Sequence, residues 1–331
     1  MTRALAFAAV ILCWSAAPAL AGNSSFALRP VTYTPSNPVT QSYFVLPARP
    51  GQVIQSEFRI TNAGTATGTA LLYVVDATTG MTSGAVYLSR TTPRRDVGRW
   101  LRLGVARVTL TPGESRVVPF RVVVPTHVRP GDHLGGIVAE NLAVDGDTAV
   151  GGKKGGSFRI RVRHLTIVAV QLALPGARVE RLALTGGSFG RMGAYPTLML
   201  ALRNTGTVMF KSRGTVRLTN AKGVVVERRS FSLDTFLPRT GIGYPLVLHE
   251  NLPSGVYLAA VRIAYGAHVL RKVLTIGVAK ANAVVRSVAP PPPAPVATTR
   301  KTSMLPWIVG VAGAMLGLVG VLAALRARRP R

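Results

Sequence analysis

The fold of this chain is decided by the stretch at residues 54–65, which reads IQSEFRITNAGT. Ile54, Phe58 and Ile60 fall on one side of an extended chain, together with Ser56, while the Gln, Glu and Arg between them fall on the other. The stretch then closes on a turn at Asn62. Period-two alternation that ends in a turn predicts a β-strand with one buried face.

Similar alternating stretches follow at VPFRVVV (residues 118–124) and LMLAL (198–202), with turn residues between them and almost no helical period. Two short segments, NAKG at 220–223 and YGAH at 265–268, are typical of hairpin connections. The sequence therefore predicts an all-β protein built of sandwiches.

The body of the chain also repeats itself. RITNAGT at 59–65 resembles LRNTGT at 202–207, and PGDHLGGIV at 130–138 resembles PSGVYLAAV at 253–261. We therefore predict two tandem β-sandwich domains, 22–174 and 175–280. In this interpretation residues 158–172 form the last strand of the first domain.

Residues 1–21 have the features of a secretory signal peptide, with a basic Arg3, an apolar stretch and a small-residue cleavage site at 19–21. The single cysteine, Cys13, lies inside the apolar stretch after Leu12, which favours its removal with the signal over a lipoprotein anchor. The mature chain would then have no thiol. This excludes thiol catalysis, disulfides and zinc sites that use cysteine.

The other end predicts a membrane anchor. Residues 305–325 are 21 uncharged residues, about 31 Å as a helix, and more basic residues follow them than precede them. This places the basic tail at 326–331 in the cytoplasm and the body outside the cell membrane, lifted on a Pro-rich linker at 281–304. Gly313 and Gly317 form a GxxxG pair that could support a homodimer through the helix.

Several short motifs occur along the chain: FALRP at 26–30, SYFVL at 42–46, RPGQ at 49–52, RITN at 59–62, PGDHLGGI at 130–137 and IVAVQL at 167–172. Taken with the order of segments described above, they resemble the WxL-protein-interacting cell-surface proteins of Gram-positive bacteria. The resemblance implies two immunoglobulin-like domains, the first of a peptidoglycan-binding type and the second of a host-binding type, and no catalytic residues.

Charge is the most informative feature for function, because 40 Lys and Arg face only 12 Asp and Glu, a formal net charge of +28. Arginine binds oxyanions in a bidentate way, so wall polymers are candidate ligands. The alternative is a solvated surface in an Arg-rich chain from a GC-rich bacterium. Nucleic acid is not expected as a partner of an exported protein without interleaved aromatic residues. The candidate anion-binding residues are Arg159, Arg161 and Arg163, on one strand face about 7 Å apart, and the cluster Arg94, Arg95 and Arg99.

Two motifs match known signatures, one of a catalytic serine and one of a sortase substrate, but each has a simpler interpretation. GGSFG at 186–190 fits a nucleophile elbow at Ser188, but that motif needs a following helix, which the sequence lacks. LPRTG at 237–241 fits a sortase signal, but it lies far from the predicted anchor, so we expect a turn. The five histidines show no metal-ligand spacing, and the alternation places His164 on a buried face.

We therefore expect a non-enzymatic surface protein without cofactor or metal. It would capture a cell-wall polymer, such as peptidoglycan or an anionic glycopolymer, or another exported protein. The alternatives are a membrane-anchored assembly chaperone or accessory subunit for a surface structure and, in another class, an exported hydrolase that uses Ser188.

Overall fold

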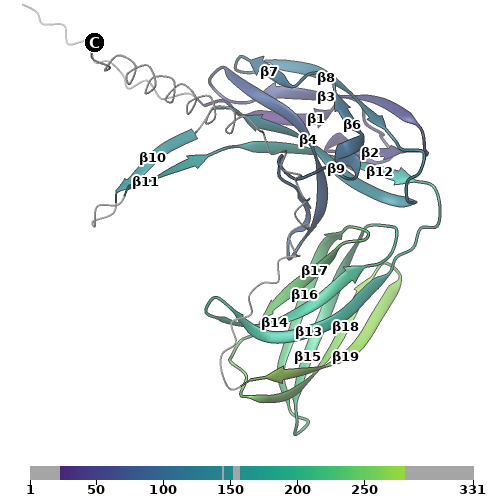
Figure 1. The fold of residues 1–331 in the computed structure, drawn as a ribbon, viewed down its shortest axis with the longest axis vertical. Coiled ribbons are helices and arrows are strands. Elements are labelled where there is room, and N and C mark those ends of the chain that lie inside the picture. Colours follow the sequence, from purple (N-terminus) through teal and green to yellow (C-terminus); the bar gives the residue numbers. More distant parts are fainter. Residues whose placement is uncertain (1–22, 144, 152–156, 280–331) are drawn as a thin grey trace, which may run out of the picture. The chain divides into compact units, whose positions relative to one another are not determined.

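The computed structural model describes residues 23–143, 145–151 and 157–279, and within them the chain is almost entirely β-structure (Figure 1). Two separate hydrophobic clusters divide it. One is built from residues between Phe26 and Leu174, and the other from residues between Leu182 and Val278. Each cluster lies between two sheets, so the all-β, two-sandwich prediction is confirmed.

The first sandwich has one sheet in the order β1-β3-β8-β6 and a second in the order β2-β12-β9-β4-β5, with β7 also paired to β4. A hairpin of β10 and β11 extends from the end of β9 (Figure 1). The elements are β1 (Phe26–Pro30), η1 (Pro38–Gln41), β2 (Phe44–Pro47), β3 (Val53–Asn62), β4 (Gly68–Gly80), β5 (Gly84–Tyr87), α1 (Val97–Trp100), β6 (Leu101–Leu103), β7 (Arg107–Leu110), β8 (Ser115–Val123), β9 (Gly131–Asn141), β10 (Asp145–Gly151), β11 (Ser157–Val162) and β12 (Leu165–Leu174).

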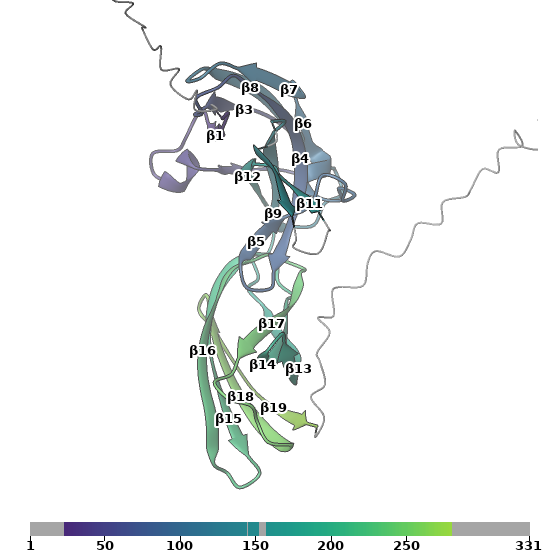
Figure 2. The same ribbon diagram turned by 90° about the vertical axis from the view of Figure 1, so that its left-hand side faces the viewer.

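The second sandwich has three strands in the order β13-β14-β17 and four in the order β16-β15-β18-β19 (Figure 2). Its elements are β13 (Leu182–Met192), β14 (Tyr195–Asn204), β15 (Phe210–Asn220), β16 (Val225–Phe236), β17 (Gly241–Val247), β18 (Gly255–Tyr265) and β19 (His268–Val278).

Strand order identifies the fold class. In an immunoglobulin sandwich, strands A, B, E and D form one sheet and G, F and C the other. Here β1, β3, β8 and β6 take the first four places, and β12, β9 and β4 take the other three. The second sandwich matches with β13-β14-β17 opposite β15, β18 and β19, and Tyr257 at the start of β18 donates a hydrogen bond back to the Pro253 carbonyl at 2.8 Å, as in a tyrosine corner. Both sandwiches are immunoglobulin-like.

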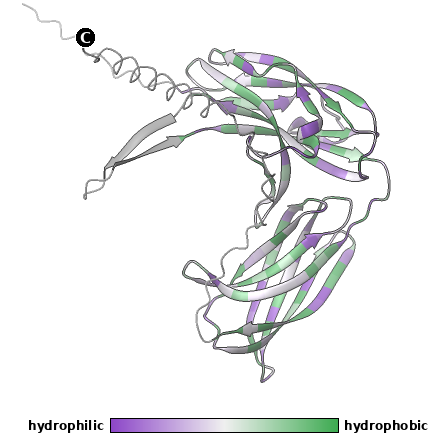
Figure 3. Cartoon of the chain, viewed as in Figure 1, coloured by the Kyte–Doolittle hydropathy of each residue, from purple (hydrophilic) through white to green (hydrophobic). Residues whose placement is uncertain are grey.

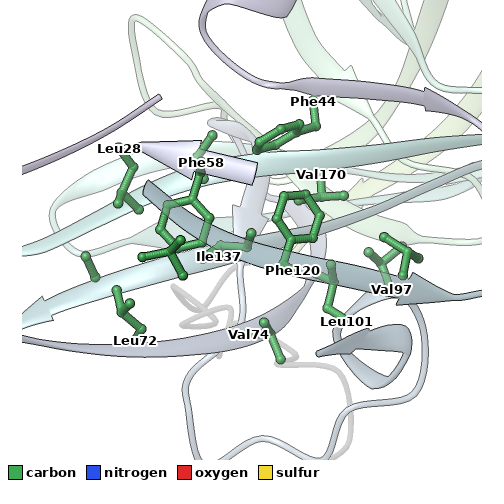
Figure 4. Packing of buried hydrophobic residues seen from close by; sticks show 14 of the residues in the cluster. Leu28, Phe44, Phe58, Leu72, Val74, Val97, Leu101, Phe120, Ile137 and Val170 are labelled. Atoms are coloured by element: carbon green, nitrogen blue, oxygen red, sulfur yellow. The ribbon is translucent and has the colours of Figure 1, made fainter. Parts of the chain in front are cut away.

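The core of the first sandwich follows from the stretch that predicted the fold. Phe58 and Ile60 are completely buried, while Glu57 and Arg59 point to solvent from the same strand. Phe120 from β8 packs against Phe58 and lies edge-on to Phe44, with ring centroids 4.9 Å apart (Figure 4). A similar alternation of buried and exposed residues runs along strands of both sandwiches, such as β8 and β15 (Figure 3).

The internal repeat marks equivalent points of the two sandwiches. Asn62 ends β3 and Asn204 ends β14, and both side chains are fully buried. The Asn62 amide donates to the carbonyls of Ala66 (2.8 Å) and Leu110 (3.0 Å), and its oxygen accepts from the N–H of Gly64.

Asn204 repeats this arrangement in the second sandwich. It donates to the carbonyls of Val208 (3.0 Å) and Phe236 (2.9 Å) and accepts from the N–H of Gly206. The other repeated motif, PGDHLGGIV in the first sandwich and PSGVYLAAV in the second, contains the start of β9 and of β18. The first residues of these strands, Gly131 and Gly255, both have positive φ.

The hairpin predictions at 220–223 and 265–268 are also confirmed, since these residues join β15 to β16 and β18 to β19. LPRTG is a turn at Pro238 and Arg239, as expected, but the residue with positive φ is Arg239 rather than Gly241.

One strand was predicted wrongly. Residues 158–172 are not a single strand, because β11 ends at Val162 and β12 begins at Leu165. The interruption breaks the alternation from which His164 was placed on a buried face, and His164 is exposed.

In the part of the chain that the structure describes, no helix has the length and apolar character needed to cross a membrane. The predicted signal peptide at 1–21, the predicted membrane segment at 305–325, and Gly313 and Gly317 within it lie outside the described residues.

We predict that Asn204→Ala will lower the free energy of unfolding by about 2 to 3 kcal/mol, because it leaves two buried carbonyls and one N–H without a partner. Chemical denaturation followed by fluorescence measures the change. Asn251→Ala is the control, because Asn251 is exposed and bonds only to Arg191. Equal effects of the two substitutions would contradict a structural role for Asn204.

Candidate functional site

An arginine-lined pocket lies beside β4 in the first sandwich. The segment between β5 and β7 passes over this strand and leaves a cavity of about 880 Å³. Four arginines from the segment line this cavity: Arg90, Arg94, Arg99 and Arg102. No acidic residue lines it.

A buried carboxylate holds this segment in place. Asp76, near the end of β4, is 6% exposed and accepts hydrogen bonds from the backbone N–H groups of Arg95, Asp96 and Gly98. The Asp76–Gly98 bond is 2.7 Å long, and Gly98 packs so close to β4 that a side chain there would collide with the backbone. The position of the arginines therefore depends on one carboxylate outside the pocket.

The arginines of the pocket differ in how firmly they are held. Arg90 lies over the ring of Tyr73, 5.7 Å from its centroid, and Arg102 donates to the carbonyl oxygens of Arg99 and Leu101. Burial, followed by the nearby Glu140 carboxylate, raises the pKa of Tyr73, so its hydroxyl stays neutral at physiological pH.

Arg94 and Arg99 are the arginines of this pocket that could take up an anion. Both side chains are exposed, and neither guanidinium has a partner among the described residues. The planar guanidinium group is suited to phosphate and carboxylate oxygens.

The sequence-predicted arginines are thus only partly brought together. Arg94 and Arg99 line the pocket, but the side chain of Arg95 does not, although its backbone is bonded to Asp76. Arg159 lies in β11 opposite Ala149, and Arg161 lies two residues further along the same strand; their side chains are outside what the structure describes.

Arg163 lies beyond the end of β11 and has a structural partner. It donates to Glu140 at 2.8 Å, and the Glu140 side chain is only 6% exposed. A buried carboxylate needs such a partner, so this guanidinium is engaged within the protein.

The sequence analysis missed a second feature, the outer edge of β12. β9 pairs with β12 along its whole length, but β2 pairs with its other edge only from Val170 to Ala173. Over Leu165–Ala169 no described strand occupies that edge. We call these five residues, together with Val162 at the end of β11, the β12 edge.

The β12 edge carries exposed apolar side chains. Val162, Leu165 and Ile167 are 45%, 52% and 38% exposed, whereas Val168 and Val170 point into the core. The sequence LTIVAVQLAL is apolar at most positions on both faces, so it gives no sign that one face is exposed.

The surroundings of Ser188 do not match those of a catalytic serine. Ser188 lies inside β13 opposite Met199, and β14 follows after a short turn, so the strand-to-helix turn of a nucleophile elbow is missing there. Among the described residues, no group of three or more His, Cys, Asp or Glu side chains could hold a metal ion.

Two buried or half-buried acids instead pair with histidine. His133 bonds to Asp96, and His249 bonds to Glu227 at 2.7 Å. Burial raises the pKa of Glu227, but hydrogen bonds from the His249 backbone and ring outweigh burial and bring that pKa below its usual value. These pairs are structural in character.

Comparison with known proteins gives fold likeness only. No family model matches the chain, and no curated protein matches it. Among solved structures, the class 5 fimbrial chaperone CfaA is 12% identical, with 76% of this chain and 99% of that one covered and a TM-score of 0.31.

The E. coli chaperone DraB is 13% identical, with 77% and 98% covered and a TM-score of 0.32, and a PapD-like domain of human CEP192 is 11% identical, with 53% and 99% covered and a TM-score of 0.26. At such identities and TM-scores, these likenesses carry no argument about what this chain binds.

We predict that Asp76→Asn will lower the free energy of unfolding by about 2 to 4 kcal/mol, because an amide oxygen cannot accept all three N–H bonds and its NH₂ group opposes a donor. Thermal unfolding gives the global effect. Hydrogen exchange should be faster at the amides of Arg95 and Gly98.

Asp234→Asn is the matched control, because Asp234 is 56% exposed and pairs only on the surface with Lys211. If exchange at Arg95 and Gly98 stayed as slow in Asp76→Asn as in the native protein, Asp76 would not be what holds the segment.

Proposed function

We propose that this chain is an exported binding protein that holds another exported protein by strand addition along the β12 edge. It would serve as an assembly chaperone or accessory subunit for a surface structure. The observation that carries the proposal is an open strand edge with exposed apolar side chains, within a domain that is otherwise well packed.

Open strand edges are hazardous for a soluble domain. Unpaired N–H and C=O groups on an edge can template pairing with another chain, and natural proteins usually protect such edges with charge, proline or a covering segment. Over Leu165–Ala169 there is neither a charged residue nor a proline. The Thr166 hydroxyl donates a hydrogen bond to the Phe26 carbonyl of β1 at 2.6 Å, but no described strand pairs with this edge. An unpaired edge without charge or proline is favourable for a partner strand.

The chemistry of the β12 edge also indicates what the partner supplies. An added strand would pair with the outward backbone groups of alternate residues, and its side chains would cover Leu165 and Ile167. The partner is therefore expected to contribute an extended segment with apolar residues at every second position.

The place of action in this proposal comes from the sequence. A signal peptide at 1–21 would export the chain, and the apolar segment at 305–325 would keep it at the cell membrane. The partner would accordingly be a protein that passes the same membrane.

A second candidate function is capture of an anionic wall polymer, and the arginine pocket favours it. Arg94 and Arg99 are exposed, have no partner among the described residues, and line a cavity without acidic residues. The two candidates differ in salt dependence, because the Debye length falls to about 3 Å at 1 M salt and weakens contacts of exposed charges. Strand addition is largely insensitive to salt.

Site-specific photo-crosslinking in living cells tests the strand-addition proposal. A photoreactive amino acid at position 165 should join the chain to one exported protein. The same crosslink should still form when isolated membranes are irradiated in 1 M salt. The same amino acid at position 117 is the control, because Val117 is exposed to a similar degree as Ile167 but lies on the other sheet.

We further predict that Ile167→Asp will abolish the crosslink at position 165, since a carboxylate would be buried under the partner strand. Val117→Asp should leave it unchanged. Ile167 and Val117 are both nearly 40% exposed, so the melting temperatures of the two variants should stay close to that of the native chain. Equal crosslinking at positions 165 and 117, or loss of the crosslink when irradiation takes place in 1 M salt, would refute strand addition at this edge.

A further inference from the structure

The outer face of the four-stranded sheet in the second sandwich carries a row of exposed arginines. Their positions follow from the strand register. Arg228 of β16 lies directly opposite Arg217 of β15, and Arg262 of β18 lies directly opposite Arg271 of β19. The middle strands join the two pairs, because Thr215, two residues before Arg217, is opposite Arg262.

Each strand of the sheet thus contributes one arginine to a diagonal band. We call Arg228, Arg217, Arg262 and Arg271 the arginine band. Strands lie about 4.8 Å apart and diagonal neighbours are about 7 to 8 Å apart, so each guanidinium is within reach of the next. The band crosses the whole width of the sheet.

Nothing on this face neutralises the band. All four side chains are exposed, and none donates a hydrogen bond or forms an ion pair among the described residues. The acidic residues of this sandwich are engaged elsewhere or lie off the band: Glu180 is near His268, Glu227 bonds to His249, Asp234 bonds to Lys211, and Glu250 follows β17.

Like charges directly opposite each other destabilise a sheet, and here two such pairs are adjacent. The surface around them forms a shallow groove of about 680 Å³. The four arginines line it together with Thr215, Ser230, Arg229, Lys272 and several apolar residues, and no acidic residue does. Such a groove would gain most from a ligand that brings several negative charges in a row.

We propose that the arginine band binds a linear polymer with regularly spaced phosphate groups. Guanidinium groups take phosphate oxygens in a bidentate way, and hydroxyls of Thr215 and Ser230 supply further donors beside them. The band crosses all four strands, and Arg213 of β15 is exposed beside it on the same face. A line of charges of this kind matches an extended chain of phosphates better than a plane of lipid headgroups. This binding is independent of the β12 edge and of the arginine pocket, which belong to the first sandwich.

The test uses the full chain in neutral phosphatidylcholine nanodiscs and fluorescently labelled inorganic polyphosphate as the probe. Affinity is measured by anisotropy over a range of salt concentrations. The variant replaces the four band arginines with glutamine. We expect it to lose most of the binding, and the log–log slope of affinity against salt to become shallower by about 3 if all four contact phosphate.

A matched control removes the same charge from the first sandwich. It replaces Arg29, Arg59, Arg107 and Arg121, which are all exposed, with glutamine. The control should bind polyphosphate nearly as tightly as the native chain. If it loses as much affinity as the band variant, binding reflects net charge alone and the proposed site is wrong.

Stability separates loss of the site from loss of the fold. Removing two opposed like-charge pairs should leave the melting temperature of the band variant unchanged or raise it. Polyphosphate should raise the melting temperature of the native chain but not of the variant. Binding to vesicles with anionic lipid, with no binding to polyphosphate, would overturn the proposal in favour of a membrane-facing surface.

Discussion

The structure depends on a buried asparagine at the end of one strand in each sandwich. Asn62 and Asn204 each hold together a turn that leaves the strand and a carbonyl from a second strand end, through the same pattern of hydrogen bonds. A fully buried amide is tolerated because its donors and its acceptor are satisfied. The bonds fix the chain where it leaves the central strand, so the opposite sheet can pack onto Phe58 in one sandwich and Leu200 in the other.

Several of the few acidic residues are buried and bonded within the protein, and this shapes its surface. Asp76 binds backbone N–H groups, Glu140 binds Arg163, and Glu227 binds His249, and each of these carboxylates is at least nine-tenths buried. Many arginines are consequently left without a partner on the sheet faces and in the loops. Much of the positive charge behind the net charge of +28 is therefore concentrated on particular surfaces of the protein.

The protein has two kinds of surface that are suited to interaction. The β12 edge offers backbone groups and apolar side chains, which suit an extended peptide. The arginine pocket and the arginine band offer guanidinium groups without counter-charges, which suit oxyanions. They lie on different elements, so one chain could hold a protein partner and an anionic polymer at the same time. The arginine-rich second sandwich would then contribute attachment, and the first sandwich would contribute partner choice.

The sequence by itself determined the all-β class, the two sandwiches and the equivalence of Asn62 with Asn204, because alternation and turn chemistry are local properties. It also identified Arg94 and Arg99, since they are close together in the chain. It missed the break between Val162 and Leu165, and with it the exposure of His164, because one continuous alternation spans the interruption. Only the tertiary structure decided which edge of β12 stays open and which arginines meet across strands. Both depend on strand pairing between residues far apart in the sequence, and no local pattern specifies such pairing.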